Sequence, residues 1–96
     1  MAGRARSRWK DGSAKELLGL SDAEEAIVEL RLRLADEVRR LRTTQGLTQR
    51  DLAERIGSSQ SRVAFLEQGD ASAELMIRAL LVLGATRRQI GRLVAA

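Results

Sequence analysis

Residues 47–69 read LTQRDLAERIGSSQSRVAFLEQG, and this stretch decides the fold. Thr48 and Ser59 are each placed to cap a helix, and Gly57 lies where the first of these helices must end. The second helix is expected over residues 59–66, and Gly69 follows it. One inward-facing apolar set is expected from the two helices together: Leu52, Ala53, Ile56, Val63 and Leu66. Two short helices joined by a glycine turn, with a small residue where they cross, are typical of a helix-turn-helix motif.

Upstream of this motif the sequence predicts one long amphipathic helix. Ser21 and Glu24 have the spacing of a capping box, and apolar residues then recur every three or four positions until Gly46. About 23 residues at 1.5 Å each make this helix roughly 34 Å long, more than a small bundle can cover. A second apolar row on its first half widens the apolar surface, which indicates a partner at the projecting end. This second row consists of Val28, Leu32 and Ala35.

Two further helices are predicted downstream of the motif. The first covers roughly residues 72–83 and presents Leu75, Ile77, Leu80, Leu81 and Val82; the second opens at Thr86 and carries Ile90, Leu93 and Val94. The chain has no proline and no alternating apolar pattern, so no strand is predicted. The fold class is therefore all-α with five helices, or six if Ser13 and Glu16 cap a short helical turn. We expect a flexible basic arm over residues 1–12 and one helix-turn-helix domain with a helical extension over residues 13–96.

Charge and composition restrict the function. The net charge of +4 comes from 17 basic and 13 acidic residues, and residues 1–20, with five basic and two acidic side chains, carry +3 of it. Any affinity of the remaining domain for nucleic acid must come from the placement of its charges. Cysteine and histidine are absent, no cofactor motif is present and the acids form no recognisable pair, so we expect no enzyme, cofactor or metal. With no apolar run long enough for a membrane span and no signal core, a cytoplasmic location is expected.

Over about residues 38–84 the apolar, capping and glycine positions resemble the Cro/C1-type (XRE) repressors, with a lambda-repressor-like DNA-binding domain. The resemblance implies that Gln49 braces a phosphate and the recognition helix, and that Gln60 and Ser61, after the cap Ser59, reach base edges. A glutamine can pair bidentately with adenine. It also implies that Arg62 and Gln68 lie beside the phosphates. The alternative for each of these side chains is an ordinary exposed polar residue.

Two positions of the motif need separate interpretation. Phe65, the only phenylalanine, occupies the outward position of the recognition helix, where the family more often has a polar or small residue. It is expected either to meet thymine methyl groups in the groove or to fold back onto the domain. Glu67 would repel phosphate if it pointed outward. The resemblance implies that it points inward to an arginine, here Arg42, as a structural ion pair that fixes how the helices dock.

Beyond the motif, the Leu18-Gly19-Leu20-Ser21-Asp22 lead-in, the long helix and residues 77–85 resemble HigA-type antitoxins. That resemblance implies a transcriptional repressor that also neutralises a RelE/HigB-like ribonuclease toxin and represses its own operon. The alternative is a stand-alone phage-type regulator without a toxin. Toxin contact is expected on apolar residues near the N-terminus, which could instead fold back on the core: Trp9, Leu17, Leu18, Leu20, Ile27 and Val28.

A homodimer is expected, because one recognition helix contacts too few base pairs and the family reads two half-sites about 34 Å apart. The expected dimer surface includes the C-terminal helix through Ile90, Leu93 and Val94.

Overall fold

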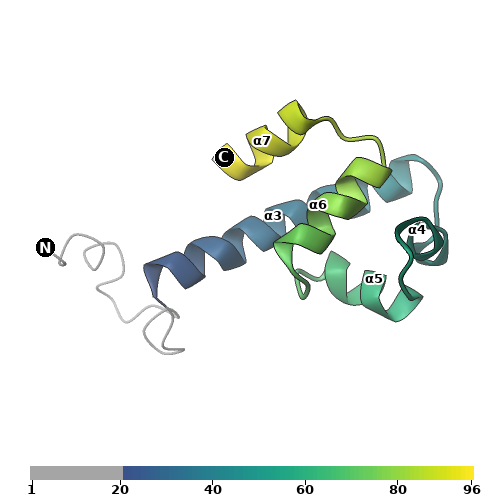
Figure 1. Ribbon diagram of the computed structural model, residues 1–96, viewed down its shortest axis with the longest axis horizontal. Helices are drawn as coiled ribbons and strands as arrows, with labels where there is room; N and C mark the ends of the chain where they lie inside the picture. Colours follow the sequence, from purple (N-terminus) through teal and green to yellow (C-terminus); the bar gives the residue numbers. More distant parts are fainter. Residues whose placement is uncertain (1–20) are drawn as a thin grey trace, which may run out of the picture.

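The computed structural model describes residues 21–96, and this part of the chain consists of five α-helices without a strand (Figure 1). The helices are α3 (Asp22–Thr44), α4 (Gln49–Ile56), α5 (Gln60–Glu67), α6 (Ala73–Val82) and α7 (Arg87–Ala95). The all-α fold predicted from the sequence is thus confirmed. The predictions for the basic arm, the short helical turn and Trp9, Leu17, Leu18 and Leu20 lie outside the described residues.

Each described helix begins after a serine or threonine that satisfies one of its free amides. The capping side chain accepts a hydrogen bond from the backbone N–H three residues later, as preferred N-caps do. The five caps are Ser21, Thr48, Ser59, Ser72 and Thr86. At the other end of α4, Gly57 has φ +67° and ψ +40°, a left-handed conformation that costs glycine little and ends the helix.

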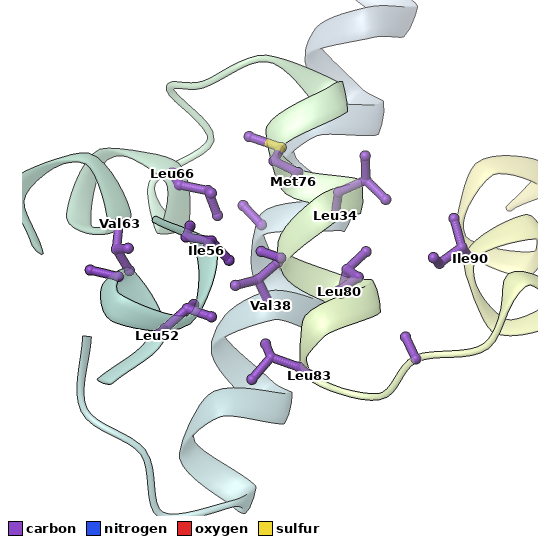
Figure 2. Packing of buried hydrophobic residues seen from close by; sticks show 14 residues of the cluster. Leu34, Val38, Leu52, Ile56, Val63, Leu66, Met76, Leu80, Leu83 and Ile90 are labelled. Atoms are coloured by element: carbon purple, nitrogen blue, oxygen red, sulfur yellow. The ribbon is translucent and has the colours of Figure 1, made fainter. Parts of the chain in front are cut away.

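Helix α3 is the central element of the bundle. Helix α6 packs along it, α4 and α5 lie on one side and α7 lies on the other (Figures 1 and 2). Each of the five helices contributes to a single apolar core, with Leu34, Leu52, Leu66, Met76 and Leu80 among its fully buried side chains. The core thereby fixes the position of α4 and α5 relative to α3.

The buried face of α6 differs from the prediction. Leu80 is buried as expected, but Leu81 and Val82 are exposed, and Met76 and Ala79 take their place in the core. Every residue from Met76 to Val82 except Arg78 is apolar. The segment therefore contains too few polar residues to define which face turns inward. Packing against α3 decides it.

The first turns of α3 extend past the rest of the described bundle. No other described helix packs over the apolar side chains there, so Ile27 is 45% exposed and Val28 is 41% exposed. Leu32, one turn further on, lies over Gly69, where a Cβ atom would be 2.7 Å from the Leu32 Cδ2 atom. The start of α3 therefore presents an apolar surface that ends against the turn after α5.

Helix α7 closes the bundle on the opposite side. Arg33 Nε donates a hydrogen bond to the Leu93 carbonyl at 3.0 Å and ties the end of α7 to α3. Ile90 is only 8% exposed because it packs into the core of its own chain, whereas Val94 remains exposed. Of the three side chains expected at a dimer surface, Ile90 is therefore already covered within the monomer. Among the helices of residues 21–96, none combines the length and apolar character that a membrane span requires.

Candidate nucleic-acid interface

The turn between α4 and α5 brings the two helices close together. Gly57 reverses the chain, and the Ser58 N–H donates to the Ala53 carbonyl at 2.8 Å, which closes the end of α4. Ala53 is 3% exposed at this crossing, where a larger side chain would force the helices apart. Ser59 then starts α5 after only two intervening residues. The geometry is that of a tight helix-turn-helix.

Helix α5 has one buried side and one exposed side. Val63, Leu66 and Glu67 face the bundle. The side chains predicted to meet DNA are the ones left in solvent: Gln60, Ser61, Arg62, Phe65 and Gln68. These exposed side chains include no acid, and eight residues at 1.5 Å each make a helix of about 12 Å, short enough to enter a major groove.

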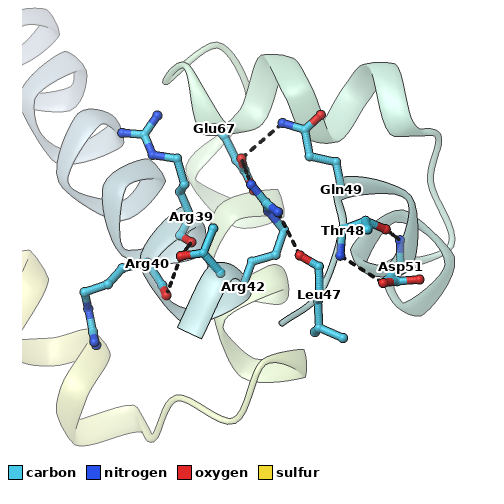
Figure 3. A network of polar contacts seen from close by, with 9 residues as sticks. Arg39, Arg40, Arg42, Leu47, Thr48, Gln49, Asp51 and Glu67 are labelled. Carbon is cyan, nitrogen blue, oxygen red and sulfur yellow. Dashed lines mark hydrogen bonds and ion pairs between the residues drawn. The ribbon is translucent and has the colours of Figure 1, made fainter. Parts of the chain in front are cut away.

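The only acid within α5, Glu67, points inward and is held by Arg42 of α3 (Figure 3). Arg42 Nε donates to Glu67 Oε2 at 2.5 Å, and Arg42 Nη2 donates to Glu67 Oε1 at 3.0 Å. The third guanidinium nitrogen, Nη1, donates to the Leu47 carbonyl at 2.8 Å. The two side chains are 13% and 3% exposed. A two-pronged ion pair therefore joins α3 to the end of α5 and to the segment before α4.

Gln49, the first residue of α4, extends the same network. Its Nε2 atom donates to Glu67 Oε1 at 3.2 Å, so Gln49 connects the start of α4 to α5. Gln49 also lines a surface hollow with Arg42, Leu47, Thr48, Arg50 and Gln60. Arg50 was not singled out in the sequence, although it follows Gln49 in the first turn of α4 and is exposed. The hollow thus combines the N-terminus of α4, which favours anions, with the exposed Arg50, whereas Arg42 in the same hollow is already paired with Glu67.

Asp51, in the first turn of α4, stabilises the start of this helix by a capping box with Thr48. The Thr48 N–H donates to the Asp51 carboxylate at 2.8 Å, and the Asp51 N–H donates to the Thr48 hydroxyl at 3.0 Å. The hydrogen bond from the Thr48 backbone holds the pKa of Asp51 below its usual value of 3.8. This capping box fixes the helix end on which Gln49 and Arg50 are carried.

Phe65 does not fold back onto the domain. Its side chain is 54% exposed, the highest value among the large apolar side chains in the described part of the chain. It borders a second hollow that α5, the following turn and α6 form together, lined by Arg62, Phe65, Asp70, Ala71, Ser72 and Leu75. The apolar neighbours Ala71 and Leu75 could not be assigned from the sequence, because they lie beyond the motif and reach Phe65 only through the fold.

Two short helices joined by a tight turn, the second of which exposes a side without acids, define a helix-turn-helix protein. The family model described as helix-turn-helix matches residues 38–90, more than half of the chain, and the chain belongs to this Cro/C1-type family. It is a DNA-binding transcriptional regulator. Comparison with characterised proteins and with solved structures gave no match.

Proposed function

We propose that this regulator is a sequence-specific repressor that places α5 in the major groove of its operator. The observation that carries this proposal is the division of charge on α5. Its one acid, Glu67, is buried against Arg42, while its exposed side keeps only neutral side chains and Arg62. On a DNA-reading helix an outward carboxylate is repelled by the phosphates on both sides of the groove, unless it accepts a hydrogen bond from a cytosine amino group. An ordinary surface helix meets no such repulsion.

The proposed DNA contacts follow from the place of each residue in α4 and α5. Gln60 and Ser61, in the first turn of α5 after the cap Ser59, read base edges, where glutamine pairs bidentately with adenine. Arg62 and Gln68 contact the backbone beside them. Gln49, which already holds Glu67, uses its place at the start of α4 to bind a phosphate.

The experiment is a binding titration with the full chain. A random duplex library is enriched on the immobilised protein, and the best sequence is measured by fluorescence anisotropy against a scrambled duplex at several salt concentrations. We expect the enriched duplex to bind at least about 1,000-fold more tightly than the scrambled one. Equal affinity for both duplexes at every salt concentration would refute sequence-specific repression.

We propose that the functional unit is a homodimer that reads two half-sites about 34 Å apart. Support comes from α7, where Val94 is exposed beside the partly buried Leu93. Ile90 contributes only indirectly, by holding α7 on the core. Sedimentation equilibrium is expected to give twice the monomer mass at tens of micromolar. A Val94→Glu variant should shift the equilibrium toward monomer, and a monomeric wild-type protein at that concentration contradicts the proposal.

We further propose that the regulator is an antitoxin that neutralises a RelE/HigB-type ribonuclease toxin through the N-terminal part of the chain. The supporting observation is the exposure of Ile27 and Val28 on the projecting start of α3. Trp9, Leu17, Leu18 and Leu20 belong to the same proposed surface, although they lie outside the described residues. The stand-alone regulator remains the alternative, and it gives this surface no partner.

Co-expression with the product of the adjacent gene distinguishes the two. Ile27→Glu combined with Val28→Glu is expected to abolish co-purification and rescue of growth while operator binding persists. Leu81→Glu is the matched control, because Leu81 is similarly exposed, at 49%, on another helix. If the neighbouring product neither inhibits growth nor co-purifies, the stand-alone regulator is the better description.

A further inference from the structure

Phe65 lies on the exposed row of α5 that points away from the core. Ser61, Phe65 and Gln68 are spaced four and three residues apart, so they fall on one line along the helix surface. This line is opposite the buried residues Val63 and Leu66. A phenylalanine in the middle of such a row exposes a large apolar surface, 54% of its maximum, to water. Folding of the monomer gives no reason for that exposure.

The surroundings of the ring are also apolar on one side. Ala71 and Leu75 line the hollow beside Phe65 together with the polar residues Arg62, Asp70 and Ser72. A polar base edge placed against the exposed ring would lose hydrogen bonds to water, and the ring offers no replacement for them. The ring suits an apolar group instead. On the floor of the major groove the base edges offer a single apolar group, the 5-methyl group of a pyrimidine.

We propose that Phe65 recognises a pyrimidine 5-methyl group in the operator, a proposal that rests on the insertion of α5 into the major groove. Phe65 follows Ser61 by four residues, about 6 Å along the helix axis. Base pairs are stacked about 3.4 Å apart, so the methyl group lies within about two steps of the base that Ser61 meets. Arg62, one turn before Phe65, binds the adjacent phosphate and sets the depth of the ring.

The test changes only the 5-methyl group of a pyrimidine, by removing it from thymine or adding it to cytosine. In the duplex enriched from the random library, each thymine is replaced in turn by deoxyuridine, and each cytosine in turn by 5-methylcytosine. Wild-type protein, Phe65→Ala and the control Leu81→Ala are titrated by fluorescence anisotropy. Leu81 is exposed to a similar degree on a different helix, so its replacement controls for loss of exposed apolar surface.

Burial of one methyl group contributes about fourfold in affinity. For wild type and Leu81→Ala we therefore expect an about fourfold loss at one thymine per half-site on deoxyuridine replacement, or an about fourfold gain at one cytosine on methylation. A thymine effect assigns the group to thymine, and a cytosine effect assigns it to 5-methylcytosine. In Phe65→Ala the same replacement should have no effect.

Three results overturn the proposal. The wild type can be insensitive to every replacement, the sensitivity can persist unchanged in Phe65→Ala, or Phe65→Ala can alter only self-association or protein binding, which would assign the ring to a protein interface. In each case a duplex still binds specifically, so the proposed function stands. If no duplex is enriched at all, the proposed function fails first and this inference with it.

Discussion

Replacing Arg42 by methionine is expected to destabilise the protein by about 3 kcal/mol, the lower end of the cost of breaking a buried ion pair. The change leaves the Glu67 carboxylate, 3% exposed, with only the Gln49 amide as a donor. It also leaves the Leu47 carbonyl without its hydrogen bond from Nη1. We take the lower end of that cost because Gln49 still donates a hydrogen bond to Glu67. For a domain of this size the loss corresponds to a fall in Tm of about 12 to 24 °C.

The Glu67→Met change should cost less, because Arg42 then keeps the Leu47 carbonyl and 13% of its surface in solvent. The double variant should cost less than Arg42→Met alone, since no unpaired charge remains buried. Urea unfolding followed by circular dichroism at 222 nm gives the four free energies. Asp36 and Arg39 form an exposed pair on α3 and serve as the control, for which we expect no resolvable coupling. Additive costs for Arg42 and Glu67 would refute the reasoning.

Three further outcomes are expected. Gln60→Ala should weaken binding to the enriched duplex by about 1 to 3 kcal/mol while leaving binding to scrambled DNA nearly unchanged in a salt titration; equal weakening of both contradicts a base-reading role. Gly69→Ala should cost about 1 to 2 kcal/mol in urea unfolding, because φ is +89° there, and Leu32→Ala should restore little of it; full rescue would assign the cost to the Leu32 contact instead. Asp51→Asn should lower stability at pH 7, since a carboxylate with a depressed pKa stabilises the fold above its usual value of 3.8 and loses this effect as the pH falls through its folded pKa. The difference from wild type in urea midpoint should therefore shrink below about pH 4, and a difference independent of pH would show that the Thr48 contact does not depend on charge.

The helices were predictable because their ends are determined locally. Each starts after a serine or threonine whose side chain accepts a hydrogen bond from the amide three residues later, and Gly57 supplies the left-handed residue that ends α4. The pairing of Arg42 with Glu67 is not local, since 25 residues separate them, and it was reached through the resemblance to a family. What could not be predicted depends on packing between helices.

Helix α6 illustrates that limit, because a nearly continuous apolar segment has no polar residues to orient it. Ile90 was expected at a surface between two chains, but the loop before α7 turns it onto the core. The environment of Phe65 had the same difficulty, since Leu75 and Ala71 reach it from a different helix and turn. In each case the sequence identifies an apolar side chain without showing what covers it.

The central position of α3 has a consequence for synthesis on the ribosome. Val38 of α3 and Leu80 of α6 are both fully buried in the same core, yet Leu80 leaves the ribosome about 40 residues later. At about 5 to 20 residues per second, the apolar stripe of α3 stays open for about 2 to 8 s. A nascent helix in that state offers an amphipathic target to chaperones before any DNA-reading surface exists. The amount of active regulator in a cell should therefore respond to translation speed across residues 45–80.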